Sequence, residues 1–217
     1  MGDLNALSDF ARQQLAPVLD VSGGILYSAA ATIRPYPLYL LGLNPGGSPE
    51  RVTNTLRASI DDLNSKTTNS YLDESWAGSP IGEARLQRRV RWLLEALGHE
   101  PRDVPASNLL FVRSRNAKGV DFERIANICW PVHERILQIV RPKLILVFGT
   151  SDISPYSFLS RKYKAANEHI VSSGHGSWVC RSFEATGHFR VAGLPHLSRY
   201  KVIGHEHVLQ WLKKLAL

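Results

Sequence analysis

Short apolar runs, each followed by a polar loop, recur along this chain and alternate with helical patterns. Four runs are typical of buried strands and cover residues 38–43, 108–112, 144–148 and 189–194. Apolar side chains recur at helical spacing over residues 86–97 and 125–140, and they give residues 1–20 the pattern of an amphipathic helix. Two further helices are expected, one from about residue 154 and one over roughly 205–215.

Strands that alternate with helices favour a parallel sheet with helices on both faces. We therefore predict an α/β fold with three layers, α/β/α, around a central, mainly parallel four-stranded sheet. The length of 217 residues fits a single domain over residues 1–217. Residues 178–184 alternate as a further edge strand would, and the polar residues 48–80 form a segment of the length that is usually functional or partly disordered.

The balance of charges indicates a polyanionic partner. The net charge of +7 favours DNA or another nucleic acid first and an anionic surface second, although a basic protein without such a partner would look the same. The sequence has no run of 18 apolar residues and no secretory signal pattern. We therefore expect a cytoplasmic monomer that does not enter a membrane. Cys129 and Cys180 lie far apart and support neither a disulfide framework nor a metal or iron–sulfur site, so no cofactor is expected.

Each predicted strand is followed by a distinctive polar loop. The carboxyl ends of parallel strands meet at one edge of a sheet, where ligands bind in open α/β folds, so the loops are expected to form one polar rim. They cover residues 44–47, 113–116, 149–152 and 195–200. The first loop, Asn44-Pro45-Gly46-Gly47, taken alone is also a good turn, because Asn starts turns, Pro fixes φ and Gly allows positive φ.

Two of these loops resemble motifs of the uracil-DNA glycosylase superfamily. Residues 42–46 are similar to its first motif, and most to the mismatch-specific and single-strand-selective branches, in which Asn replaces a catalytic Asp. Residues 194–199 resemble its second motif, and the stretches between them resemble its central region in the same order, over roughly residues 25–205. The resemblance implies a uracil-DNA glycosylase-like fold and cleavage of a base–sugar bond in DNA.

The resemblance places the first loop at the reacting bond. Asn44 would hold the attacking water through its side-chain amide, and the base pocket would be shaped by Gly42, Leu43 and Pro45. In the uracil-specific branch a Tyr after the corresponding Pro blocks pyrimidines that carry a 5-substituent. This chain has Gly46 there, with Gly47 next, so we predict tolerance of 5-substituted or otherwise modified pyrimidines.

The second motif departs from the family pattern. The family's base-contacting His or Asn precedes the Pro, whereas here Leu194 precedes Pro195 and His196 follows it. His196 is a candidate to donate to a base oxygen or a phosphate, and the competing interpretation is an exposed loop histidine. Leu197 is the candidate wedge that replaces a flipped base, or else a core residue. The other candidates for DNA contact are Ser198, Arg199, Tyr200 and Lys201.

Other candidates lie elsewhere on the predicted rim. The family reads the base edge from the end of the second strand, where the polar choices are Asn108, Arg113 and Ser114. Tyr71 and Trp76 are candidates for an aromatic platform under the base, although Trp76 equally suits the core. One helix carries a cluster expected to point outward, as a solvated face or a DNA-approach surface: Arg85, Arg88, Arg89 and Arg91.

The leading hypothesis is a monofunctional DNA glycosylase that flips out a deaminated or 5-substituted pyrimidine, hydrolyses its N-glycosidic bond and leaves an abasic site. It would act in DNA repair or against phage DNA with modified bases. The alternative is a non-catalytic nucleic-acid-binding protein of the same fold, which Leu194 favours. A small-molecule enzyme or nucleotide binder is a third class, disfavoured because the sequence has no P-loop or dinucleotide motif.

Overall fold

The computed structural model describes residues 2–47, 54–115, 121–185 and 189–216. A six-stranded sheet in the order β2-β1-β3-β6-β5-β4 forms the centre of this part of the chain. Its strands are β1 (Leu38–Gly42), β2 (Ala106–Asn108), β3 (Leu144–Phe148), β4 (His169–Ser172), β5 (Val179–Ala185) and β6 (Phe189–Leu194). The first four in sheet order are parallel, whereas β5 and β4 continue the sheet antiparallel. The mainly parallel α/β sheet is thus confirmed, but the predicted number of four strands is wrong.

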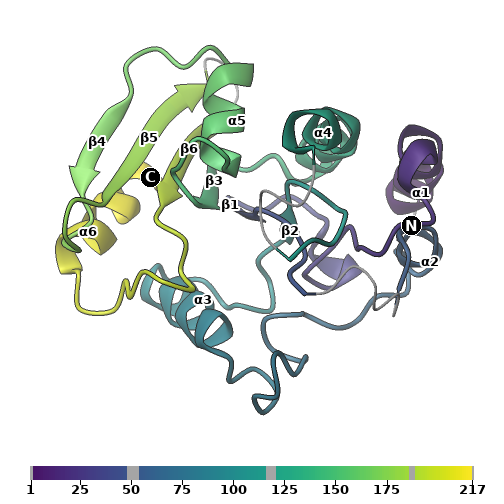
Figure 1. The fold of residues 1–217 in the computed structure, drawn as a ribbon, viewed down its shortest axis with the longest axis horizontal. Coiled ribbons are helices and arrows are strands. Elements are labelled where there is room, and N and C mark those ends of the chain that lie inside the picture. Colours follow the sequence, from purple (N-terminus) through teal and green to yellow (C-terminus); the bar gives the residue numbers. More distant parts are fainter. Residues whose placement is uncertain (1, 48–53, 116–120, 186–188, 217) are drawn as a thin grey trace.

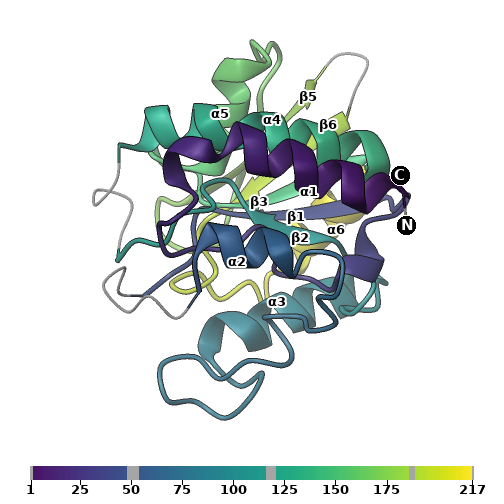
Figure 2. The same cartoon turned by 90° about the vertical axis from the view of Figure 1, so that its right-hand side faces the viewer.

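Helices cover both faces of the sheet (Figures 1 and 2). They are α1 (Gly2–Gln14), α2 (Leu56–Asp61), α3 (Arg85–Ala96), α4 (Phe122–Val140), α5 (Pro155–Lys162) and α6 (Glu206–Ala216), with 3₁₀ turns at Ala16–Val18 and Ala30–Thr32. Successive residues of a strand face opposite sides, so Tyr39 and Leu41 join the core under α1, α4 and α5, while Leu38 and Leu40 join the core under α3 and α6. Three layers result, as predicted. No helix of the described residues is long and apolar enough to cross a membrane.

The second strand differs from its prediction. Only Ala106–Asn108 pairs with β1, and the apolar residues 109–112 that follow are buried without continuing the strand. A buried apolar run after a strand has the same pattern as the strand itself, which explains the error. The correction matters for the site, because Asn108 becomes the last residue of β2 and lies at the carboxyl edge of the sheet.

Three other expectations are resolved by the fold. The predicted strand at residues 178–184 is β5, but β4 lies outside it and forms the edge. The first helix ends at Gln14 rather than at residue 20, because Pro17 lacks an N–H and lies in the 3₁₀ turn Ala16–Val18 that follows. The polar segment contains α2, and its residues 48–53 lie outside the described residues.

A buried histidine links α4 to the chain just after β2. The Nε2 of His133 donates to the Leu109 carbonyl at 3.2 Å, and its Nδ1 accepts from the Tyr39 hydroxyl at 3.3 Å. Burial lowers the pKa of His133 to about 4, so the ring is neutral near pH 7. This neutral link fixes the start of the segment that carries the second polar loop.

Candidate functional site

The loops after the four parallel strands begin at the same edge of the sheet, as predicted. The first two loops are joined directly, because Leu110 N–H donates to the Leu43 carbonyl at 2.9 Å and Ser114 N–H donates to the Pro45 carbonyl at 3.2 Å. The last two are joined by the bond from Gly149 N–H to the Leu194 carbonyl at 2.8 Å. Residue 116 of the second loop lies outside the described residues.

The side chain of Asn44 is held in one orientation. Its Nδ2 contacts the Pro45 carbonyl at 2.9 Å, the Ser114 carbonyl at 3.1 Å and the Ser114 hydroxyl at 2.9 Å. Carbonyl oxygens only accept, so the nitrogen of the amide must face them, and Oδ1 points the other way. No described residue donates to Oδ1. Asn44 therefore presents a fixed acceptor that can orient a water molecule but cannot remove its proton strongly.

Asn108 lies across from the end of β1. It pairs in register with Gly42, and a Cβ built on Gly42 would come within 2.1 Å of the Asn108 Oδ1. Only glycine leaves room for this side chain. The Asn108 side chain is buried, and its Nδ2 has no hydrogen-bond partner among the described residues. This amide lies beside the Tyr27 phenol and is covered by its neighbours, so it can read a base edge only if a bound base displaces the groups that cover it.

Tyr27 is an aromatic residue of the site that we did not predict. The Asn108 amide lies near its phenol, while burial raises the pKa of Tyr27 to about 12. Tyr27 packs against Tyr71 at 5.7 Å and Trp76 at 6.1 Å between ring centroids. Nothing in its local sequence marks it, because it lies in the apolar stretch that precedes the first strand.

The structure contradicts the predicted platform role of Tyr71 and leaves that of Trp76 a prediction. Tyr71 is buried in the core, so its ring cannot form an open platform for a base. Trp76 is half-buried, and its Nε1 donates to Glu74 at 2.9 Å. Both rings support Tyr27, which makes Tyr27 the better candidate for contact with a base.

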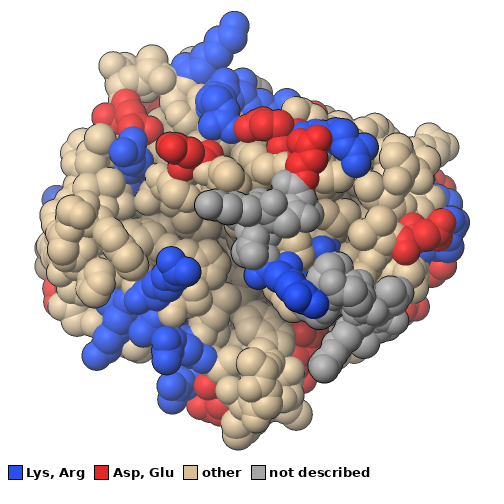
Figure 3. Space-filling model, viewed as in Figure 1, with Lys and Arg blue, Asp and Glu red and all other residues tan. Residues whose placement is uncertain are grey.

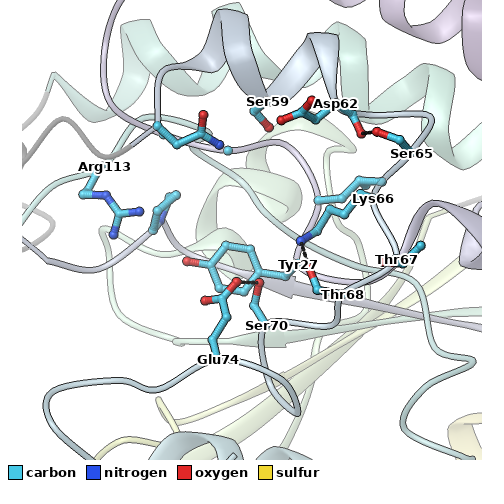
Figure 4. A pocket seen from close by; sticks show the side chains of 15 residues that line it. Tyr27, Ser59, Asp62, Ser65, Lys66, Thr67, Thr68, Ser70, Glu74 and Arg113 are labelled. Carbon is cyan, nitrogen blue, oxygen red and sulfur yellow. Dashed lines mark hydrogen bonds between the residues drawn. The ribbon is translucent and has the colours of Figure 1, made fainter. Parts of the chain in front are cut away.

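A cavity of about 540 Å³ opens beside the first loop (Figure 4). Its walls come from residues 23–27 beside β2, from α2 and from the polar segment. The Ser70 N–H donates to the Tyr27 carbonyl at 2.7 Å, which joins the first of these to the last. Of the predicted site residues, Pro45 and Arg113 line it. The other lining residues are Gly23, Gly24, Leu26, Tyr27, Asn54, Ser59, Asp62, Ser65, Lys66, Thr67, Thr68, Ser70 and Glu74.

Arg113 braces the first loop rather than facing open solvent. Its guanidinium donates to the Gly46 carbonyl and to the Ser22 hydroxyl. Gly47 adopts φ +104°, which favours glycine. Gly46 is exposed, and a Cβ built there would meet nothing within 4 Å. A side chain at position 46 is therefore sterically allowed, and its absence leaves this side of the loop open.

His196 is half-buried in the fourth loop and has a defined tautomer. Ser198 N–H donates to its Nδ1 at 3.2 Å, so in the neutral ring Nε2 carries the proton and is the donor. Burial, and to a smaller extent Arg199, lower the pKa of His196, which keeps the ring neutral. The Ser198 hydroxyl lies 2.8 Å from the same Nδ1. His196 thus offers an N–H and no charge.

Two predicted DNA contacts are core residues. Leu197 is fully buried, so it does not project as a wedge, and the competing core interpretation is correct. Tyr200 is fully buried as well, and its hydroxyl donates to the Ser173 carbonyl at 2.7 Å. Leu194, which stands where the motif that this loop resembles has a polar residue, fills the same core. Arg199 and Lys201 remain exposed and Ser198 half-exposed.

The arginines of α3 do not all point outward. Arg89 donates to the Leu197 carbonyl at 2.6 Å and to the Tyr200 carbonyl at 3.1 Å, which ties the fourth loop to α3. Arg91 pairs with Glu83 at 3.2 Å. Arg85 and Arg88 are exposed. Lys and Arg side chains gather over α3 and the adjoining loop, beside the central hollow of this face (Figure 3). We call the exposed Arg85 and Arg88 of α3, together with Arg199 and Lys201 of the loop that Arg89 ties to this helix, the basic surface.

Comparison with known proteins does not assign the chain to a family. Among the described residues, no group of three or more His, Cys, Asp and Glu side chains could hold a metal ion. No protein-family model matches the chain, and no curated protein matches it.

Proposed function

We propose that this chain is a monofunctional DNA glycosylase that flips out a deaminated or 5-substituted pyrimidine and hydrolyses its N-glycosidic bond. The observation that carries the proposal is the arrangement of two amides at one sheet edge. Among the described residues, the Asn44 nitrogen is engaged and nothing donates to its oxygen, while the buried Asn108 Nδ2, beside the end of β1, has no hydrogen-bond partner. Both lie close to a cavity with Tyr27 in its wall.

In the proposed reaction, the sugar acquires oxocarbenium character as the bond to the base breaks. The Asn44 oxygen orients a water toward the sugar carbon. The water oxygen bonds to that carbon as the C–N bond breaks, the base leaves as an anion, and the proton of the water passes to solvent. Asn cannot act as a strong general base, which suits bases that are good leaving groups. The Asn108 amide contacts the base edge, and Nε2–H of His196 donates to an oxygen of the departing base.

The spacing of the strands supports the two roles. β3 separates β1 from β6, so the loops that carry Asn44 and His196 start about 10 Å apart. A sugar and its base can lie between these loops, with the water on one side and the donor on the other. The basic surface then holds the DNA backbone, since phosphate contacts fix orientation without reading sequence.

Gly46 is the basis for the proposed base specificity. In the uracil-specific branch of the superfamily whose first motif this loop resembles, a Tyr at this place excludes a 5-substituent, whereas here no side chain stands at position 46 and a Cβ built there would meet nothing within 4 Å. Removal of a deaminated base would belong to DNA repair, and removal of a modified base would serve defence against phage DNA.

A base-release assay tests the proposal. Oligonucleotides that hold single uracil, 5-hydroxymethyl or larger 5-substituted pyrimidines, in single- and double-stranded form, are incubated with the protein and cleaved with alkali. The proposal predicts strand cleavage for at least one of them. Asn44→Ala should lower the rate at least about 100-fold, because a misplaced nucleophile costs that much. The matched control Asn127→Ala, on an exposed face of α4, should not change it.

A non-catalytic nucleic-acid-binding protein is the second candidate. The burial of Leu194 and Leu197 favours it, because the fourth loop then lacks both a polar base reader before Pro195 and a wedge. That candidate predicts DNA binding that weakens steeply with salt, together with no abasic product from any oligonucleotide.

A further inference from the structure

The cavity beside the first loop holds more than an unmodified pyrimidine. At about 30 Å³ for each non-hydrogen atom, the share of one water molecule in the liquid, its volume of about 540 Å³ has room for about 18 atoms. The roughly eight atoms of uracil would use less than half of that volume. The remaining space fits a substituent of about the size of one sugar.

Some hydroxyl and amine groups in the cavity wall have hydrogen-bonding capacity that no other described residue uses. The Ser59 hydroxyl accepts from Ile25 N–H at 3.1 Å, which leaves its own proton to donate. The Lys66 amine, half-buried, donates to the Thr68 hydroxyl at 2.9 Å, which leaves two of its three protons. Ser65 and Ser70 already donate their hydroxyl protons, to the Asp62 carbonyl and to Glu74, and can only accept from a ligand, while Thr67 adds one more hydroxyl to the wall. Such a wall matches a ligand whose groups both donate and accept.

The charges in the cavity wall are balanced. Asp62 and Glu74 are acidic, Lys66 and Arg113 are basic, and the Arg113 guanidinium is already engaged by the Gly46 carbonyl and Ser22. A phosphate would meet two carboxylates, and a cation would meet two basic groups. An apolar substituent would displace water from the Lys66 amine without replacing its hydrogen bonds, which is unfavourable. The remaining class is a neutral ligand rich in hydroxyls.

The cavity runs from the first loop to Lys66. Arg113 lies toward one end in Figure 4, Lys66, Thr67 and Thr68 lie toward the other, and the Tyr27 ring lies between them. Pro45, next to Asn44, also lines the cavity. A base that stacks on Tyr27 beside Pro45 would therefore direct a substituent toward Lys66 and Thr68.

We propose that the Lys66 end of this cavity is a subsite for a neutral, hydroxyl-rich substituent, of about the size of one sugar, on the pyrimidine. The proposal rests on the proposed function and names its substrate class: DNA with glycosylated hydroxymethyl-pyrimidines. It also explains why the polar segment, which carries most of these hydroxyls, is built into the wall of the cavity.

Equilibrium binding tests the subsite separately from catalysis. The background is Asn44→Ala, so that the substrate survives the measurement. Two fluorescently labelled duplexes are compared, one with a single 5-(glucosyloxymethyl)cytosine and one with 5-methylcytosine. We expect about ten-fold tighter binding of the glucosylated duplex, the effect of one or two net hydrogen bonds. Adding Lys66→Met and Thr68→Val should remove the preference, while the exposed control Lys143→Met should retain it.

Equal affinity for the two duplexes would overturn the subsite, as would a preference that persists in the Lys66→Met/Thr68→Val protein. Unchanged binding of the 5-methylcytosine duplex by that protein checks that it is folded, and Lys66→Gln is the milder replacement if it is not. Failure of the proposed function has a different signature, since the parent protein would then release no base from any duplex, whatever its binding preference.

Discussion

Replacing Gly42 by Ala should destabilise the fold, because the added methyl group would collide with the Asn108 side chain. The new Cβ would lie 2.1 Å from Oδ1 of Asn108, far inside van der Waals contact, and Asn108 is buried and cannot simply swing into solvent. Overpacking of this kind costs about 1–3 kcal/mol. The smaller entropy of the unfolded Ala chain offsets about 0.4–1 kcal/mol of that. The net loss is about 1–2 kcal/mol, which at about 2–4 °C for each kcal/mol should lower the melting temperature by roughly 2–8 °C in a domain of this size.

A double-mutant cycle with Asn108→Ala isolates the contact. Removing the Asn108 amide also removes a buried nitrogen without a partner, so this change alone should cost little. In the double variant the added methyl group has space. The loss in the free energy of unfolding should therefore be smaller than the sum of the losses in the two single variants, by about 1–2 kcal/mol. Gly24→Ala is the control, because its Cβ would lie 3.7 Å from the Ser59 hydroxyl, an ordinary contact. An unchanged melting temperature for Gly42→Ala, or strict additivity, would refute this account of Asn108.

Three further predictions concern the loops and the core. Gly46→Tyr should reduce release of 5-substituted bases more than about ten-fold relative to release of uracil, whereas Gly46→Ala should leave the ratio of these two rates near that of the parent. An equal effect of Gly46→Tyr on both bases would contradict the role of Gly46. Arg89→Met removes the donors to the carbonyls of Leu197 and Tyr200. It should lower the free energy of unfolding, measured by chemical denaturation, by about 1–2 kcal/mol and lower kcat for base release. If stability and kcat are both unchanged, other contacts hold the fourth loop. Burial lowers the pKa of His133 to about 4, below its unfolded value near 6.5. The neutral ring therefore adds up to about 3 kcal/mol to the free energy of unfolding above pH 6.5, and this is lost as the pH falls toward 4. His133→Phe should flatten this part of the pH–stability profile, and an unchanged slope would contradict the assignment.

The central part of the fold could be predicted from the sequence because its strands are buried on both faces. β1 and β3 are continuous apolar runs bounded by Gly, Pro or Asn, and the helices on either side have clear periodicity. β4 could not be predicted in this way. Its residues His169–Ser172 are mostly exposed on both sides, so they carry neither an apolar run nor an alternation.

The candidate site was predictable only where it depends on local loop chemistry. The position of Asn44 follows from a strand that ends in a Gly-rich loop, but two of the three contacts that orient its amide come from Ser114, 70 positions away. Tyr27 and Lys66 have no local signal, because the cavity forms only when the segment beside β2 meets the polar segment. Leu197 has the local sequence of a loop residue, yet packing under α3 and α6 buries it.

The proposed glycosylase function depends most on the water-orienting role of Asn44. Single-turnover base release, measured by mass spectrometry, tests this role most directly. With the best oligonucleotide of the panel, the parent protein and Asn127→Ala should yield the free base and an intact abasic strand at the same rate. Asn44→Ala should yield them at least about 100-fold more slowly while binding the DNA as tightly. Release at the parent rate by Asn44→Ala, or bound DNA from which the parent protein frees no base, would contradict the central claim.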